Sequence, residues 1–461
     1  MAIKAELSTR DRHFLDMSLN APMWKVVLYV GTPLALYQGL AILFTILDTM
    51  MASHISKESV SAVAYLAQLN LLLSSVGGGL AVGAGIQISR AYGEGDFVLV
   101  RKRVSSLYAI SLTMGLLILA LILPFTRSFL RLAGTPEELI AVGEEYFRVQ
   151  LFVMVVNFLN SVYIAVERAR GNARRIFLLN IAVILVKLSL TAYFVYILES
   201  GLNMIAVASL LSEMTMFVFA VRFSLMGENA FSFSLKAISL SRKVTLPMIR
   251  QSVPVIAEKA LFAFGKTIVN SMCTLYGPLM VGAMGVSNNL GGITTNPQNG
   301  YQQGSAAIIS QNYGAGRYRR VLDAFYATAA VNMLLGALIS GAELWQLRLL
   351  SGLFDGGSED FRRMIALVYR YEALGAVPLG LNAAVMALLY GLGKTQLTLV
   401  LNFSRVFVFR IPVLWFLQHC TAFGEASVGI VMMVSNISVA VLAALTALVV
   451  IRRFRRAYMK T

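Results

Sequence analysis

Long uncharged runs that alternate with short charged segments are the dominant pattern of this chain. The runs are close to the about 20 residues that a helix needs to cross about 30 Å of hydrocarbon. They predict twelve membrane-spanning helices, at 26–52, 60–90, 104–124, 144–166, 176–198, 203–223, 248–275, 280–312, 322–345, 364–391, 396–418 and 426–450. The pattern is therefore typical of an all-α integral membrane protein.

An internal repeat relates the two halves of this pattern. Residues 33–95 align with residues 254–316 without a gap, and 13 of the 63 positions are identical. Several identities are Gly, Pro or Tyr, which are not interchangeable aliphatic residues: Pro33/Pro254, Gly79/Gly300, Gly83/Gly304 and Tyr92/Tyr313. A period of about 220 residues indicates two copies of one large unit.

The repeat predicts how the chain is organised. Each copy holds six spans, an even number, so both copies enter and leave the membrane on the same side. We therefore predict two six-helix bundles related by a pseudo-twofold axis along the membrane normal. The N-terminal bundle is expected at 1–223, a polar, Ser-rich cytoplasmic linker at 224–247, and a C-terminal bundle with a basic cytoplasmic tail at 248–461.

The distribution of charge along the chain indicates a membrane topology and does not indicate a nucleic-acid partner. The chain is 57% hydrophobic and 13% charged, with a formal net charge of +16. When loops are counted from a cytoplasmic N-terminus, basic clusters such as 101–103 and 452–456 fall on the cytoplasmic side. This is the positive-inside pattern. Because the charge is divided among short loops and forms no single patch, we expect no nucleic-acid partner.

The residue pattern does not favour catalytic or metal chemistry. The three His residues are scattered, and no HExxH or paired Cys/His spacing occurs, so no metal site is expected. No Walker lysine follows a Gly-rich loop, which argues against an ATP-driven pump. A membrane-embedded enzyme that modifies lipids is a separate alternative. It would need a paired-acid, His or Ser constellation at one membrane face, and none with credible spacing is present.

Three segments resemble the multidrug and toxic compound extrusion (MATE) family. The first span contains Pro33, Gln38 and the run Asp48–Ala52 before a small-residue turn. The second half contains Gly300–Gly316, and Ser89–Gly95 is its first-half counterpart. The similarity extends over the whole chain, including the six-plus-six repeat and the linker.

The resemblance implies a secondary active antiporter in the bacterial inner membrane. Such a protein exports small amphipathic, often cationic, organic compounds in exchange for H⁺ or Na⁺ by alternating access. We expect no cofactor other than the coupling ion, no partner beyond substrate and lipid bilayer, and function as a monomer. The alternative is a lipid-linked oligosaccharide or lipid flippase of the same superfamily, with several cations along its cavity. Lys187, Lys259 and Lys266 leave that alternative open, whereas Asp48 argues against it.

Two carboxylates have no acidic counterpart in the other repeat. Asp48 aligns with Val269 and Glu258 with Tyr37, so the common fold does not require either acid. An ionisable side chain within a span costs about 2.5–3.5 kcal/mol on insertion scales and indicates function by default. From the resemblance, Asp48 is the acid of the N-lobe cavity, and Glu258 corresponds to a cation-coordinating glutamate.

Each of these acids also has a structural interpretation. Asp48 could be a carboxylate solvated at the membrane interface or a helix cap. Glu258 could form an ion pair with Lys266 or pair locally near Lys259. Gln38 lies about 15 Å before Asp48 along the same helix, and we include it among the binding residues.

Two further polar residues of the first half are candidates. Glu213 could line the N-lobe cavity with Asp48, or it could neutralise Lys187. Asn157 could contact the ion or form a hydrogen bond between helices.

One acid that the resemblance implies is missing. The tenth span should carry an aspartate about ten residues before the turn Leu389–Gly391, but Asn382 is the only oxygen-donor side chain of residues 377–384. The C-lobe Na⁺ site is therefore in doubt, and weight shifts toward proton coupling through the unmatched carboxylates. Arg405 and Arg410 are interpreted as packing or interface residues.

Overall fold

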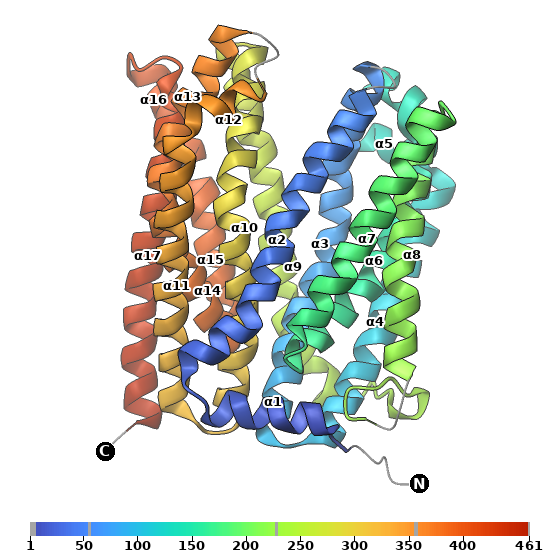
Figure 1. Cartoon of the computed structure of the whole chain (residues 1–461), viewed down its shortest axis with the longest axis vertical. Helices are drawn as coiled ribbons and strands as arrows, with labels where there is room; N and C mark the ends of the chain where they lie inside the picture. The colour runs from blue at the N-terminus through green and yellow to red at the C-terminus, as the bar shows by residue number, and fades with distance from the viewer. Residues whose placement is uncertain (1–5, 54–56, 226–228, 355–357, 460–461) are drawn as a thin grey trace. The chain divides into compact units, whose positions relative to one another are not determined.

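The computed structural model describes residues 6–53, 57–225, 229–354 and 358–459; the side chains of residues 42–64 and of Pro278 lie outside this description. Within these ranges the elements are helices, apart from an isolated β-bridge between Glu6 and Asn229 (Figure 1). The chain forms two compact units. The first comprises Met1–Leu15 and Leu43–Ile256, and the second comprises Asp16–Ile42 and Ala257–Thr461.

Five long helices or helix runs and one short 3-10 helix lie in the first unit. They are α3 (Lys57–Glu94), α4 (Phe97–Ile122) with η1 (Leu123–Phe125) and α5 (Thr126–Leu132), α6 (Glu137–Ala169), α7 (Ala173–Ala192) with the π-helix η2 (Tyr193–Ile197), α8 (Asn203–Leu225), and η3 (Leu235–Ala237). The side chain of Asp96 caps α4 by accepting from the amide of Leu99 at 2.9 Å. Leu66, Phe147, Leu151 and Ile205 form the centre of an apolar core.

The helices of the second unit follow the same order. They are η4 (Thr274–Tyr276), α10 (Pro278–Gly314), α11 (Tyr318–Trp345), α12 (Leu347–Gly352), α13 (Glu359–Leu374), α14 (Ala376–Gly391), α15 (Thr395–Phe403), the π-helix η5 (Ser404–Val408), α16 (Ile411–Cys420) and α17 (Ala426–Tyr458). Ser358 caps α13 by accepting from the amide of Phe361 at 3.3 Å. Val269, Met284 and Val428 lie in an apolar core of the second unit.

Three helices contribute to both units. α1 (Thr9–Asn20), α2 (Met23–Ser53) and α9 (Arg242–Cys273) each begin in one unit and end in the other. The first half of α2 thus belongs to the second unit, and the first half of α9 belongs to the first. The predicted bundle boundaries at 223 and 248 stay a prediction.

Glycines shared by the repeats explain why these half-helices pack so closely within each unit. A Cβ on Gly79 of α3 would lie 2.8 Å from the Cα of Ile256 on α9. At the repeat-related position, a Cβ on Gly300 of α10 would lie 2.5 Å from the Cα of Ala35 on α2. Only glycine allows two backbones to approach this closely. The repeated glycines therefore form the same helix contact in both units.

The fold is that of a multi-pass membrane protein. Eight helices of the described residues are long and apolar enough to cross a membrane, or nine if α13 and α14, which meet at a 49° bend, form one span. α2, α9 and α10 are also long, with 31, 32 and 37 residues. All twelve predicted ranges lie on these helices, but the number of spans stays a prediction.

Several predicted boundaries differ clearly from the structure, at the starts of α4, α6 and α9 and at the end of α17. α9 begins at Arg242, whereas the uncharged pattern predicts a start at 248. The amides of Val244 and Thr245 both donate to the carbonyl of Ser241 at 3.0 Å. This first turn is polar, so a pattern of hydrophobic residues does not detect it.

Candidate functional site

A cavity of about 510 Å³ in the second unit brings together three of the predicted site residues. Gln38 comes from α2, Glu258 from α9 and Asn382 from α14. Nine amide side chains line the cavity, together with six charged ones: Glu258, Lys259, Lys266, Glu372, Arg405 and Arg410. Small-molecule sites usually occupy about 300–1,000 Å³, so this cavity has the size for an organic ligand.

Glu258 is a buried carboxylate with three neutral hydrogen-bond donors. Its side chain accepts from the hydroxyl of Tyr390 at 2.8 Å, from Oγ1 of Thr398 at 2.6 Å and from Nδ2 of Asn402 at 2.6 Å. Only 5% of the residue is exposed. Buried carboxylates need such partners, and the donors come from α14 and α15.

The interpretation of Glu258 as the partner of Lys266 is wrong. The ion pairs among the described residues do not include this pair. The two residues are eight positions apart on α9, which separates them by about 12 Å along the helix axis. The three neutral donors hydrogen-bond to the carboxylate instead, and Lys259, the other alternative, acts on it electrostatically.

Asn382 leaves an acceptor available at the cavity wall. The residue is 7% exposed, and its Oδ1 has no hydrogen-bond partner among the described residues. A buried amide oxygen without a donor costs free energy. A ligand, ion or water in the cavity could supply the missing donor or charge.

Sequence reasoning missed a second acid of the cavity. Glu372 accepts from Oγ of Ser287 at 2.6 Å, and it lies so close to α10 that a Cβ on Gly291 would be 2.9 Å from its Oε1. At the 222-residue offset that relates Gly171 to Gly393, Glu372 aligns with Gln150. The test for acids without an acidic counterpart would therefore have found it.

Arg405 and Arg410 also lie on this wall, although the sequence was interpreted as placing them in packing or interfaces. Arg405 lies in the π-helix η5, and Arg410 directly precedes α16. Single π-helical turns widen the local backbone and occur often at functional sites. The sequence pattern does not reveal such a turn.

Glu213 and Asn157 are not among the described residues that line this cavity. Nδ2 of Asn160 on α6 donates to Oε2 of Glu213 at 2.8 Å and to its carbonyl at 3.0 Å. Lys187 acts electrostatically on the same carboxylate. Asn157 accepts from Ser161 of its own helix at 3.4 Å. The side chain of Asp48 lies outside the described residues.

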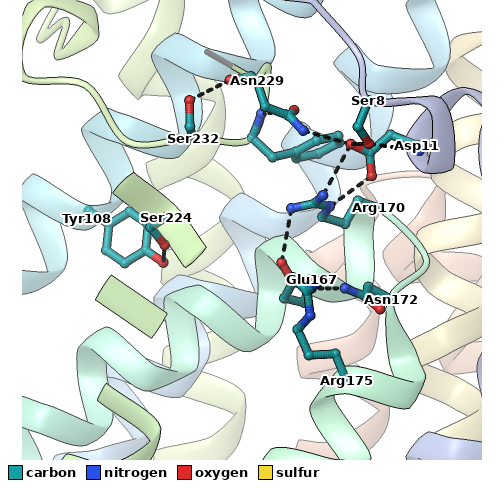
Figure 2. A network of polar contacts seen from close by, with 11 residues as sticks. Ser8, Asp11, Tyr108, Glu167, Arg170, Asn172, Arg175, Ser224, Asn229 and Ser232 are labelled. Carbon is teal, nitrogen blue, oxygen red and sulfur yellow. Dashed lines mark hydrogen bonds and ion pairs between the residues drawn. The ribbon is translucent and has the colours of Figure 1, made fainter. Parts of the chain in front are cut away.

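The first unit contains a charged network that joins residues of α1, α6 and α7 (Figure 2). Arg170 donates to both oxygens of Asp11, from Nε at 2.9 Å and from Nη2 at 3.2 Å. Nη1 of Arg170 lies 3.2 Å from Glu167, which also pairs with Arg175 at 3.3 Å and accepts from Asn172. Burial alone would lower the pKa of Arg170, but Glu167 and Asp11 outweigh it and raise that pKa.

The long apolar helices define a multi-pass membrane protein, and comparison gives its family. The MatE family model matches residues 33–193 and 254–416, one match in each repeat. The chain belongs to the MatE family, which confirms the resemblance to multidrug and toxic compound extrusion transporters.

Named relatives of this chain are transporters. It is 22% identical over 377 residues to the probable multidrug resistance protein YoeA of Bacillus subtilis (strain 168), over 79% of this chain and 80% of the relative. It is 19% identical over 317 residues to the multidrug export protein MepA of Staphylococcus aureus (strain NCTC 8325 / PS 47), over 68% and 70% of the two chains.

The fold is that of a known transporter structure. The outward-facing conformation of a multidrug resistance MATE family transporter of the MOP superfamily superposes with a TM-score of 0.92, at 19% identity, over 98% of this chain and 100% of that one. At this identity the likeness concerns the fold alone.

Proposed function

We propose that this chain is a secondary active antiporter that exports small amphipathic organic compounds in exchange for an inward-moving ion, with H⁺ preferred over Na⁺. Its relatives are named for multidrug resistance and multidrug export. The observation that carries the coupling is Glu258, a buried carboxylate at the cavity wall whose three donors are all neutral. Such a group can gain or lose a proton while its neutral hydrogen-bond partners stay in place.

Thr398 supplies a way for the protein to sense that proton. Its Oγ1 lies 2.6 Å from Oε2 of Glu258 and 2.8 Å from the carbonyl of Thr395. A hydroxyl has one proton to donate. When Glu258 is ionised, Thr398 donates to the carboxylate; when Glu258 is protonated, Thr398 turns to the Thr395 carbonyl and accepts from the acid. Protonation thus reverses a hydrogen bond between α9 and α15.

The proposed cycle uses this exchange in alternating access. Glu258 and Asp48 lose their protons toward the cytoplasm, and substrate binds. The bundles rock, and protonation from outside releases the substrate. Gln38 and Asn382 contact the bound compound, while Glu213 and Asn157 remain proposed ligands of the first half.

We further propose a bacterial inner-membrane location with both termini cytoplasmic and function as a monomer. The partners are small organic substrates and the lipid bilayer, without nucleic acid, enzymatic activity or a cofactor beyond the ion. Support comes from the basic residues of alternate loops.

Transport in proteoliposomes tests the proposal. Purified protein is reconstituted with a pH-sensitive dye inside, and uptake of a panel of fluorescent cations is measured under an imposed pH or Na⁺ gradient, each applied separately. We expect the pH gradient to drive transport. Glu258→Gln should lower coupled transport at least about tenfold, because the isosteric amide cannot exchange a proton.

Matched variants decide the assignment of the sites. Glu359→Gln removes an acid at the start of α13, outside the cavity, and should transport normally. Full coupled transport by both Asp48→Asn and Glu258→Gln would overturn the assignment. Transport that is driven only by the Na⁺ gradient would show that Na⁺, and not H⁺, is the coupling ion.

A flippase for lipid-linked compounds remains a second candidate. Lys259 and Lys266, which the sequence reading associated with this alternative, both line the cavity. Translocation of a fluorescent anionic lipid without any ion gradient would favour the flippase over the antiporter.

A further inference from the structure

Two arginines of the cavity share one neutral acceptor. Arg405 donates from Nε and Nη2 to Oδ1 of Asn436 at 3.2 and 2.8 Å. Arg410 donates from Nη2 to the same oxygen at 3.2 Å and from Nε to Oγ of Ser435 at 3.1 Å. Two like charges are therefore held side by side by an amide, and a negative charge placed beside them is electrostatically favoured.

Among the described residues no anion contacts this cluster, although Glu372 acts electrostatically on all three cations. No carboxylate of the described residues lies within 4.0 Å of the cationic nitrogens of Lys266, Arg405 or Arg410. Around the cavity as a whole, four cations face two carboxylates, a formal excess of two positive charges. Nη1 of each arginine also has no acceptor among these residues.

The other repeat shows which charge is missing. At an offset of 223 residues, Glu213 aligns with Asn436 and Lys187 aligns with Arg410. In the first unit the lysine acts on a carboxylate. In the second unit an amide occupies the position of that carboxylate, and the acid that acts electrostatically on Arg410 is Glu372, from another helix.

We propose that Lys266, Arg405 and Arg410 bind the anionic group, a carboxylate, sulfonate or phosphate, of an amphipathic organic compound. Guanidinium groups bind such groups through paired hydrogen bonds. Apolar surface for the rest of the compound is adjacent: the Arg405 guanidinium lies 5.5 Å from the ring centre of Phe262, and Met432 is also on the wall.

Transport of the bound anion would rest on the proposed antiporter function, whereas binding of the anion does not. Binding is measured without an ion gradient, so the binding site and the transport function can fail separately.

A pair of dyes that share a xanthene ring tests the site. Full-length protein in phosphatidylcholine nanodiscs is titrated with 5-carboxyfluorescein, an anion, and with rhodamine 123, a cation, and fluorescence anisotropy gives Kd. We expect saturable binding of carboxyfluorescein that rhodamine 123 does not displace. Nanodiscs without protein at high salt are the control and should show no saturable binding.

The sharpest variant leaves every cation in place. Asn436→Asp supplies an internal carboxylate to both arginines and should raise the Kd of carboxyfluorescein about tenfold, the effect of one charge-assisted hydrogen bond. Lys266→Gln should raise it about three- to tenfold. Glu372→Gln removes a competing negative charge and should lower it. Arg370→Gln, at an exposed position of α13, is the matched control and should leave Kd unchanged.

The direction of the Glu372→Gln change keeps the test decisive if another variant fails to fold, because a gain of affinity requires folded protein. Unchanged Kd in Asn436→Asp and Lys266→Gln, or the same changes for rhodamine 123, would overturn the site. Competition by added phosphatidylglycerol supports the site with a lipid phosphate as its occupant. Absence of that competition supports a soluble organic anion.

Discussion

Buried charged groups have charged partners in the network of the first unit and neutral hydrogen-bond partners in the cavity of the second. In the network, Asp11 and Glu167 lie against guanidinium groups at 2.9–3.3 Å, and their side chains are 1% and 2% exposed. In the cavity, Glu258 has only neutral donors and the two arginines have only neutral acceptors.

The difference indicates two uses of buried polarity. A matched ion pair with well-aligned hydrogen bonds holds one geometry, because removing either partner leaves an uncompensated charge. Groups held by neutral partners keep their positions but remain able to exchange a proton or accept a charged ligand. The network is therefore expected to fix the fold locally, and the cavity to carry the chemistry. Four substitutions test this contrast.

Arg170→Ala should have the largest effect. It leaves Asp11 and Glu167 without their shared cation and should destabilise the protein by about 3–5 kcal/mol. Thermal unfolding of detergent-purified protein, followed with a thiol-reactive dye, measures the loss. The isosteric cavity variant Glu258→Gln, which introduces no new charge, serves as a comparison for destabilisation caused by a buried change. A melting temperature of Arg170→Ala equal to wild type would contradict the structural role of the network.

Arg170→Lys should cost less, about 1–2 kcal/mol, because lysine keeps the charge but cannot bind both oxygens of Asp11. Its pH dependence adds a signature. A cation stabilised by acids contributes stability below its unfolded pKa, about 10.4 for lysine, and that contribution is lost as pH rises through the higher folded value. The raised pKa of Arg170 keeps its guanidinium charged in the wild type across this range. The difference in stability between pH 8 and about 11 should therefore be larger for the variant than for the wild type.

Thr398→Val removes the hydroxyl that changes partner with the charge of Glu258. We expect proton-coupled transport to fall about three- to tenfold, the effect of one hydrogen bond to a charged group, with little loss of stability. Thr398→Ser keeps the hydroxyl and should transport nearly as wild type. Equal rates for valine and serine variants in proteoliposomes would remove Thr398 from the coupling mechanism.

Glu213→Gln should have the smallest effect on stability, below about 1 kcal/mol, because Nδ2 of Asn160 can still donate to the amide oxygen. If transport falls while the melting temperature is unchanged, Glu213 belongs with the residues that carry transport. A large loss of stability would instead place it with the ion pairs that fix the fold.

The sequence predicted the helices and the family because both depend on local or repeated patterns. Runs of apolar residues at spanning length indicate helices wherever they occur, and the glycines at 79 and 300 recur because both units need the same close contact. Glu258 was found for a related reason: the alignment of the repeats distinguishes residues required by the common fold from those present in one copy.

Partners could not be predicted, since they depend on packing between segments that are distant in the chain. Glu258 and Asn402 are 144 residues apart, and Asp11 and Arg170 are 159 apart. Arg405 and Arg410 looked like packing residues because a hydrophobicity pattern does not show a π-helical turn or the direction of a side chain. The amino-acid order determined which helices form and that there are two copies, since both follow from periodicity. The tertiary structure decided which charges are matched and which face a cavity, because hydrogen bonds reach only about 3 Å and only packing brings those groups together.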